Sequence, residues 1–138
     1  MNVLSIALAT VAGTVAYFVF GGVMMGIMGD RLKAIYRPHA VVFRGETEIM
    51  KYMPVALGSM FLSIAVAATI FARIHPGGAD WMAGGKFGLA MGAFVAFAHV
   101  GHDFATLNIG PKLAVTMAGL HFIQWVLACI AIALVYKP

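Results

Sequence analysis

Residues 3–28 read VLSIALATVAGTVAYFVFGGVMMGIM, and none of them carries a charge. A helix rises about 1.5 Å per residue, so this run is long enough to cross a bilayer core of about 30 Å. No Lys or Arg precedes it and it is longer than the apolar core of a signal peptide, so we expect it to remain in the mature protein. The stretch therefore predicts a membrane-spanning helix.

The composition of the whole chain extends this prediction. Of its 138 residues, 62% are hydrophobic and 10% are charged, whereas soluble domains have roughly 45–50% apolar and about 25% charged residues. So few charges exclude a Rossmann domain, a secreted disulfide scaffold and a nucleic-acid-binding module. The net charge of +4 comes from thinly spread basic residues, and we expect no nucleic-acid partner. The single cysteine, Cys129, excludes an intrachain disulfide and a C-x-x-C redox motif.

Three further apolar segments have the length of a membrane helix. We expect four spans, at about residues 3–28, 52–71, 85–107 and 113–135. With short turns between them they predict an all-α fold, a four-transmembrane-helix up-and-down bundle that occupies residues 1–138 as a single membrane domain. The charged segment 30–51 is expected to be an interfacial loop, because Arg37-Pro38 disfavours a helix that continues through it.

Basic residues predict the orientation in the membrane. The segment 30–51 and the turn after the third span lie on the same side and hold six Lys or Arg, against three on the opposite side. The positive-inside rule then places segment 30–51 in the cytoplasm and both termini outside.

Small residues recur every fourth position on two of the expected helices. They are Gly84, Gly88, Gly92 and Ala96 on the third span, and Gly22 and Gly26 on the first. Small residues at this spacing let helix backbones approach closely in lipid. We expect the third helix to be central, and we favour packing within the chain over a dedicated oligomer interface.

The informative polar residues of the third and fourth spans are His99, His102, Asp103, His121 and Gln124. Residues three or four apart share a helix face. A hairpin turn centred near Gly110-Pro111 would place His99 opposite Phe122, and so level with His121. The sequence therefore predicts one coupled polar cluster of His99, His102, Asp103 and His121 inside the membrane, with Gln124 beside it.

Three interpretations of this cluster remain open. It would be a structural network that holds the two helices in register, or a binding pocket or proton relay in which Asp103 is neutral, paired or in contact with water. It would also offer ligands to a divalent metal through His99, His102, Asp103 and His121. The E-x-x-H pairs of di-iron bundles are missing, and a bis-histidine haem does not fit so short a hairpin without another subunit.

Several local features accompany the four spans: Gly21-Gly22 through Gly26, the segment from Asp103 to Asn108, and His121-x-x-Gln124-Trp125. In these features the chain resembles small bacterial four-helix integral membrane proteins catalogued only as a domain of unknown function. The resemblance covers nearly the whole chain. It implies a fold, a topology and a bacterial inner membrane location, and it implies no activity.

The sequence favours a role other than catalysis. No nucleophile with an adjacent base and no phosphate-binding loop is visible. We expect an oligomeric or accessory membrane subunit, within a homo-oligomer or a larger membrane complex in the lipid bilayer. A small transporter or channel gated by Asp103 and the histidines is the first alternative, and a metal- or cofactor-binding membrane protein is the second.

Overall fold

The computed structural model describes residues 2–138, except for the side chains of residues 46 and 47. In order, the elements are α1 (Val3–Tyr36), the 3-10 helix η1 (Arg37–Val42), α2 (Glu46–Ile74), α3 (Trp81–Phe94), the π-helix η2 (Val95–Val100), α4 (Gly101–Thr106) and α5 (Pro111–Val135). Helices α3, η2 and α4 follow one another without a break and form one continuous span. The described residues therefore contain four helices long and apolar enough to cross a membrane. The predicted all-α, four-helix fold is confirmed.

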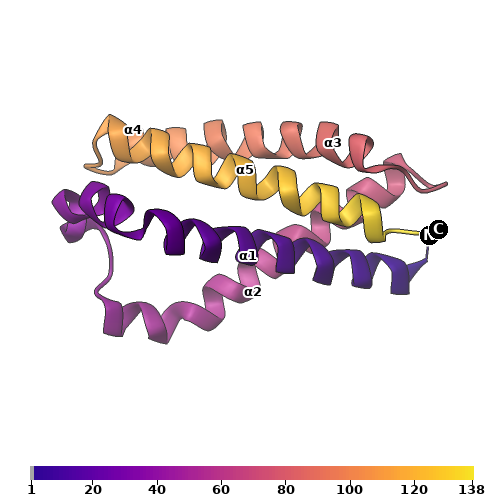
Figure 1. The fold of residues 1–138 in the computed structure, drawn as a ribbon, viewed down its shortest axis with the longest axis horizontal. Helices are drawn as coiled ribbons and strands as arrows, with labels where there is room; N and C mark the ends of the chain where they lie inside the picture. The colour runs from indigo at the N-terminus through magenta and orange to yellow at the C-terminus, as the bar shows by residue number, and fades with distance from the viewer. Residues whose placement is uncertain (1) are drawn as a thin grey trace.

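Figure 1 shows α1, α3 and α5 running along the long axis of the molecule, with α2 crossing them obliquely. Both termini lie together at one end, near the turn between α2 and α3. The other end carries η1, the start of α2 and the turn between α4 and α5. We call these the terminal end and the loop end.

Local sequence signals explain where several helices begin. Asn2 caps α1 by accepting a hydrogen bond from the Ser5 amide, and Asp80 caps α3 by accepting one from the Ala83 amide at 2.8 Å. Pro111 is the first residue of α5, where its missing N–H is not needed.

The charged segment 30–51 is mostly helical, which differs from the predicted loop. Helix α1 continues to Tyr36, η1 follows, and α2 already begins at Glu46. Residues 30–36 contain good helix formers and no breaker, so nothing ends α1 before Arg37-Pro38. Because α2 begins early, Pro54 lies inside this helix and not in its first turn.

The central helix is α5, and the expectation that the third helix is central was wrong. Helix α5 packs against α3 on one side and α1 on the other, and it also contacts α2. The buried residues of α3 are its three glycines alone, on a single face. The close backbone contacts of α3 are made with α5, whereas α5 packs extensively against both α3 and α1.

The glycines of α3 bring its backbone directly onto α5. A Cβ added at Gly88 would lie 2.7 Å from the Val126 Cα, and one at Gly92 would lie 2.9 Å from the Phe122 carbonyl oxygen. At Gly84 an added Cβ would lie 2.5 Å from the Ala133 Cβ. Such close approach is the packing that the four-residue spacing predicts.

The other small residues of the predicted stripes behave differently. Among the described residues, no neighbouring atom lies within 4 Å of a Cβ added at Gly22 or Gly26, so neither makes a close contact with another helix there. On α1 the close approaches occur instead at Gly13, against Ile132 and Ile64, and at Gly21. Ala96 is half-buried in η2, which packs on α5.

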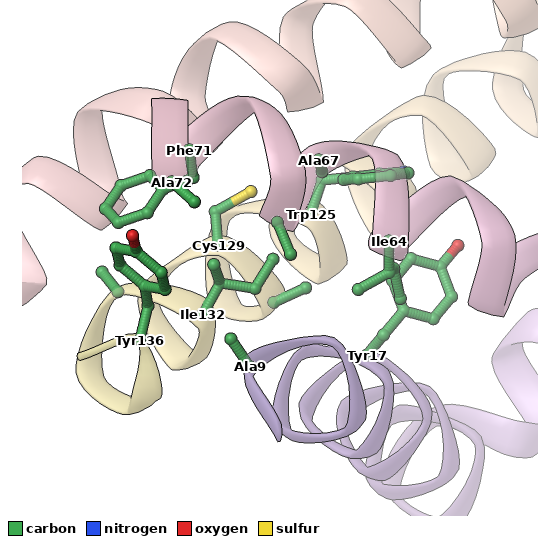
Figure 2. Close-up of a cluster of buried hydrophobic side chains, with 13 residues drawn as sticks. Ala9, Tyr17, Ile64, Ala67, Phe71, Ala72, Trp125, Cys129, Ile132 and Tyr136 are labelled. Atoms are coloured by element: carbon green, nitrogen blue, oxygen red, sulfur yellow. The ribbon is translucent and has the colours of Figure 1, made fainter. Parts of the chain in front are cut away.

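The main core lies towards the terminal end. Figure 2 shows Phe71, Cys129, Ile132 and Tyr136 gathered where α2 and α5 meet, with Ala9 of α1 beside them. Phe71, Cys129 and Ile132 are 0% exposed. A smaller cluster at the loop end contains Val100, Ile109, Leu113 and Ala114, and the end of α1 and η1 pack against it.

Candidate functional site

The polar site inside the bundle is formed by α5 and α1. His121 Nδ1 lies 2.8 Å from the Tyr17 Oη, and the two rings are stacked with centroids 6.5 Å apart. Trp125, one turn further along α5, meets the edge of the Tyr17 ring at a centroid distance of 6.2 Å. Tyr17 is 3% exposed. His121 therefore faces the interior, as predicted, but its partner is a tyrosine of the first helix.

Gln124 supports the same contact from the next turn of α5. Its Nε2 donates a hydrogen bond to the Tyr17 carbonyl oxygen at 3.3 Å. A Cβ at position 21 would lie 2.7 Å from this Nε2, so glycine at that position leaves room for the amide. We call Tyr17, His121 and Gln124 the interior polar site.

The interior polar site opens on a small cavity of about 170 Å³ between α1 and α5. His121 and Gln124 line the cavity together with apolar side chains, among them Met25 and Met117. His121 is ten residues after Pro111, which places it roughly 15 Å along the helix and deep in a bilayer core of about 30 Å. A cavity of this size with polar groups on its wall has room for a few water molecules or one small polar ligand.

His99 and His102 of the third span are exposed on the outside of the bundle, and Asp103 beside them is half-buried. His99 Nδ1 is 3.4 Å from Asp103 Oδ2, and the side chains of these residues are 69% and 21% exposed. His102 is also exposed, and its carbonyl oxygen accepts a hydrogen bond from Thr106 Oγ1 at 2.9 Å. We call His99, His102 and Asp103 the outer polar face.

The structure does not join the four predicted residues through hydrogen bonds into one network. Among the side chains it describes, His121 bonds to Tyr17 and His99 to Asp103, and no hydrogen bond or ion pair joins the two groups. The hairpin register explains the difference. Phe122 lies against Gly92, whereas the prediction placed it opposite His99, seven residues or about two helical turns away.

Two features of the chain cause this change of register. Pro111 begins α5, so the turn lies before it, at residues 107–110, and not at the Gly110-Pro111 pair. The π-helix Val95–Val100 also fits more residues into each turn than an α-helix does. A Gly-Pro pair is typical both of a turn and of the first residues of a helix. The folded hairpin shows that Gly110-Pro111 is the start of α5.

The geometry does not support a metal centre. Within residues 2–138, no three His, Cys, Asp or Glu side chains among those described are grouped so that they could hold a metal ion. Of the predicted ligands, His121 bonds to Tyr17 in the interior, whereas His99 and His102 are exposed and Asp103 lies beside His99.

Comparisons with protein-family models, curated proteins and solved structures found no match to this chain. The resemblance to four-helix proteins of unknown function therefore stays a prediction. The roles of the two polar groups rest on their geometry.

The sequence predicts no role for Tyr17 and Gly21 in the interior polar site. Both lie in a run without charges, where a tyrosine reads as one more apolar residue. The spacing of four between Tyr17 and Gly21 was the available signal, since it places a phenol and a gap for a neighbouring side chain on one helix face. Nothing in the sequence alone pairs that face with His121.

Proposed function

We propose that the protein is a non-enzymatic integral membrane subunit that joins another membrane-spanning chain through the outer polar face. The observation that carries this proposal is the 69% exposure of the His99 side chain within a helix apolar enough to span a membrane. Ionisable residues in membrane helices almost always face the bundle interior or a water-filled cavity. A neighbouring chain would cover His99 and His102 and provide partners for them.

The position of the outer polar face along its helix fits this role. Asp103 is three residues before Thr106, where α4 ends. It is therefore about 5 Å along the helix from the end of the span. A polar side chain at that depth is less unfavourable than at the bilayer centre. A partner can therefore contact the face without burying an ion deep in lipid.

We place the protein in a bacterial inner membrane, with the loop end in the cytoplasm and both termini outside. The excess of Lys and Arg at the loop end, six against three, supports this orientation. The partner is a second copy of the chain or a different subunit, and crosslinking in the native membrane distinguishes them by mass.

A photo-crosslinking residue at Ala98 tests the proposal, because Ala98 is exposed between the His99 and Phe97 side chains. The matched control is the same residue at Val55 on α2, which is 67% exposed. We expect a protein adduct of defined mass from position 98 and lipid adducts from position 55. Lipid adducts alone from both positions would overturn the proposal.

A small transporter or channel is the second candidate, and the cavity beside His121 favours it. A histidine deep in the bundle, bonded to a tyrosine and next to a cavity of about 170 Å³, has the chemistry of a protonatable gate. Reconstitution into vesicles with an internal pH dye tests this function. Proton flux that disappears in His121→Gln would support a transporter, and equal dye traces for vesicles with and without protein would exclude proton transport.

A further inference from the structure

A groove of about 670 Å³ lies where the end of α1, η1 and the start of α2 meet at the loop end. Three cationic side chains line it: Lys33, Arg37 and Arg44. Apolar and aromatic side chains line it as well: Tyr36, Phe43 and Ile49. The groove therefore combines a cationic part with an apolar part.

The cationic part is built by the local backbone. Lys33 and Arg37 are four residues apart, and the Arg37 amide donates to the Lys33 carbonyl oxygen, so the two side chains leave the same helix face. Arg44 lies over the Tyr52 ring, 3.8 Å from its centroid, and its Nη1 donates to Glu48 at 2.6 Å. A guanidinium has five N–H donors, so Arg44 retains donors for a further anion.

The apolar part is held in place by packing. The Tyr36 and Phe43 rings meet edge to face with centroids 5.3 Å apart, and both pack against the smaller core at the loop end. Ile49 is 40% exposed at the start of α2. A hydrocarbon chain bound there would contact an apolar surface that is already ordered by this packing.

The groove lies where lipid headgroups are expected. The uncharged run of α1 ends at Met28, and Lys33 and Arg37 follow it by five and nine residues. The long apolar run of α2 begins after Lys51. Clusters of Lys and Arg directly beside membrane spans attract anionic lipids.

We propose that this groove binds one anionic phospholipid. Its phosphate contacts Lys33, Arg37 and Arg44, and its glycerol and first acyl carbons contact Tyr36, Phe43 and Ile49. Free phosphate would use only the cationic part, whereas a zwitterionic lipid would bring its own ammonium group, a fourth cation, next to the three of the groove. An anionic lipid complements both parts, and this inference does not depend on the proposed function.

Native mass spectrometry of the purified protein tests the site, with phosphatidylglycerol and phosphatidylcholine of identical acyl chains added in equal amounts. The test variant is Lys33→Gln/Arg37→Gln. The matched control is Arg73→Gln/Lys86→Gln, which removes two exposed cations near the terminal end. Circular dichroism and thermal unfolding of each variant verify that it is folded, and Arg44→Gln serves as a second test variant.

We expect the wild-type protein and the control variant to retain phosphatidylglycerol in preference to phosphatidylcholine. Each cation removed from the groove should lower this preference roughly fivefold, since one Lys or Arg near an anionic membrane contributes about a factor of that size. Equal retention of the two lipids by the wild-type protein would overturn the proposal. So would an equal loss of preference in the control variant, or full displacement of the lipid by glycerol phosphate, which has no acyl chains.

Discussion

The terminal end and the loop end of the bundle are packed in different ways. At the terminal end, glycines of α3 touch the α5 backbone, and Phe71 and Ile132 are fully buried. At the loop end the outer polar face and a cationic groove are open to the surroundings. The difference indicates that the terminal end provides most of the stability, whereas the loop end carries the surfaces that bind other molecules.

The largest expected loss of stability comes from a bulky side chain placed at the glycine contact between α3 and α5. Gly88→Leu places side-chain atoms where the Val126 backbone already lies, since a Cβ alone would be 2.7 Å from the Val126 Cα. Helix backbones cannot give way as a flexible side chain does, so we expect a loss of about 3 kcal/mol or more of unfolding free energy, or failure to fold. Thermal unfolding in mild detergent measures it.

The control for this prediction is Gly119→Ala. Gly119 is an exposed glycine in α5 with no atom within 4 Å of an added Cβ. Alanine there should leave stability unchanged or raise it by up to about 1 kcal/mol, because alanine favours a helix over glycine. Similar losses in Gly88→Leu and Gly119→Ala would contradict the close packing of α3 on α5.

Removing a buried ring should have an effect of similar size. Phe71 is 0% exposed and its ring contacts Tyr136 and Phe87, so Phe71→Ala leaves a cavity and should lower the unfolding free energy by about 3–5 kcal/mol. Phe97, at the loop side and 82% exposed, is the matched residue. Phe97→Ala should change stability by less than about 0.5 kcal/mol. Equal losses would show that the two ends are packed alike.

The same chemical change should have opposite signs at the two buried tyrosines. Among the described residues, the buried Tyr136 Oη has no hydrogen-bond partner, so Tyr136→Phe should raise the unfolding free energy by about 1 kcal/mol. Tyr17 bonds to His121, so Tyr17→Phe should lower it by about 0.6 kcal/mol, the average for such bonds in membrane helices. Chemical denaturation of both variants side by side checks the signs, and a stabilising Tyr17→Phe would speak against the interior polar site.

The smallest effect on stability is expected at the outer polar face. Asp103→Asn removes the charge beside His99, whose side chain is largely exposed, so unfolding should change by less than about 0.5 kcal/mol. Assembly with a partner should weaken nonetheless, as measured by native mass spectrometry or crosslinking from position 98. Unchanged assembly in Asp103→Asn would show that the Asp103 carboxylate does not take part in the proposed interface.

The sequence predicts the four helices because long uncharged runs have few alternatives in lipid. It also predicts the glycine contact of α3, since Gly84, Gly88 and Gly92 repeat at the spacing that close helix pairs use. The inward direction of His121 followed from the high free energy of a polar side chain in lipid. These predictions depend on local pattern alone.

The remaining features depend on how the helices meet. In a membrane chain the lipid-facing and core-facing residues are both apolar, so periodicity does not show that Tyr17 faces α5 or that α5 is central. The π-helix and the start of α5 at Pro111 set the hairpin register, and a shift of about two turns placed Phe122 against Gly92 and not opposite His99. Register is a property of the folded pair of helices.

A double-mutant cycle on His121 tests this account most directly. One cycle combines His121→Gln with Tyr17→Phe, and the other combines His121→Gln with Asp103→Asn, with unfolding free energy as the measurement. We expect a coupling of roughly 0.6–1.7 kcal/mol with Tyr17 and a value near zero with Asp103. Coupling with Asp103 and none with Tyr17 would contradict the division into an interior site and an outer face.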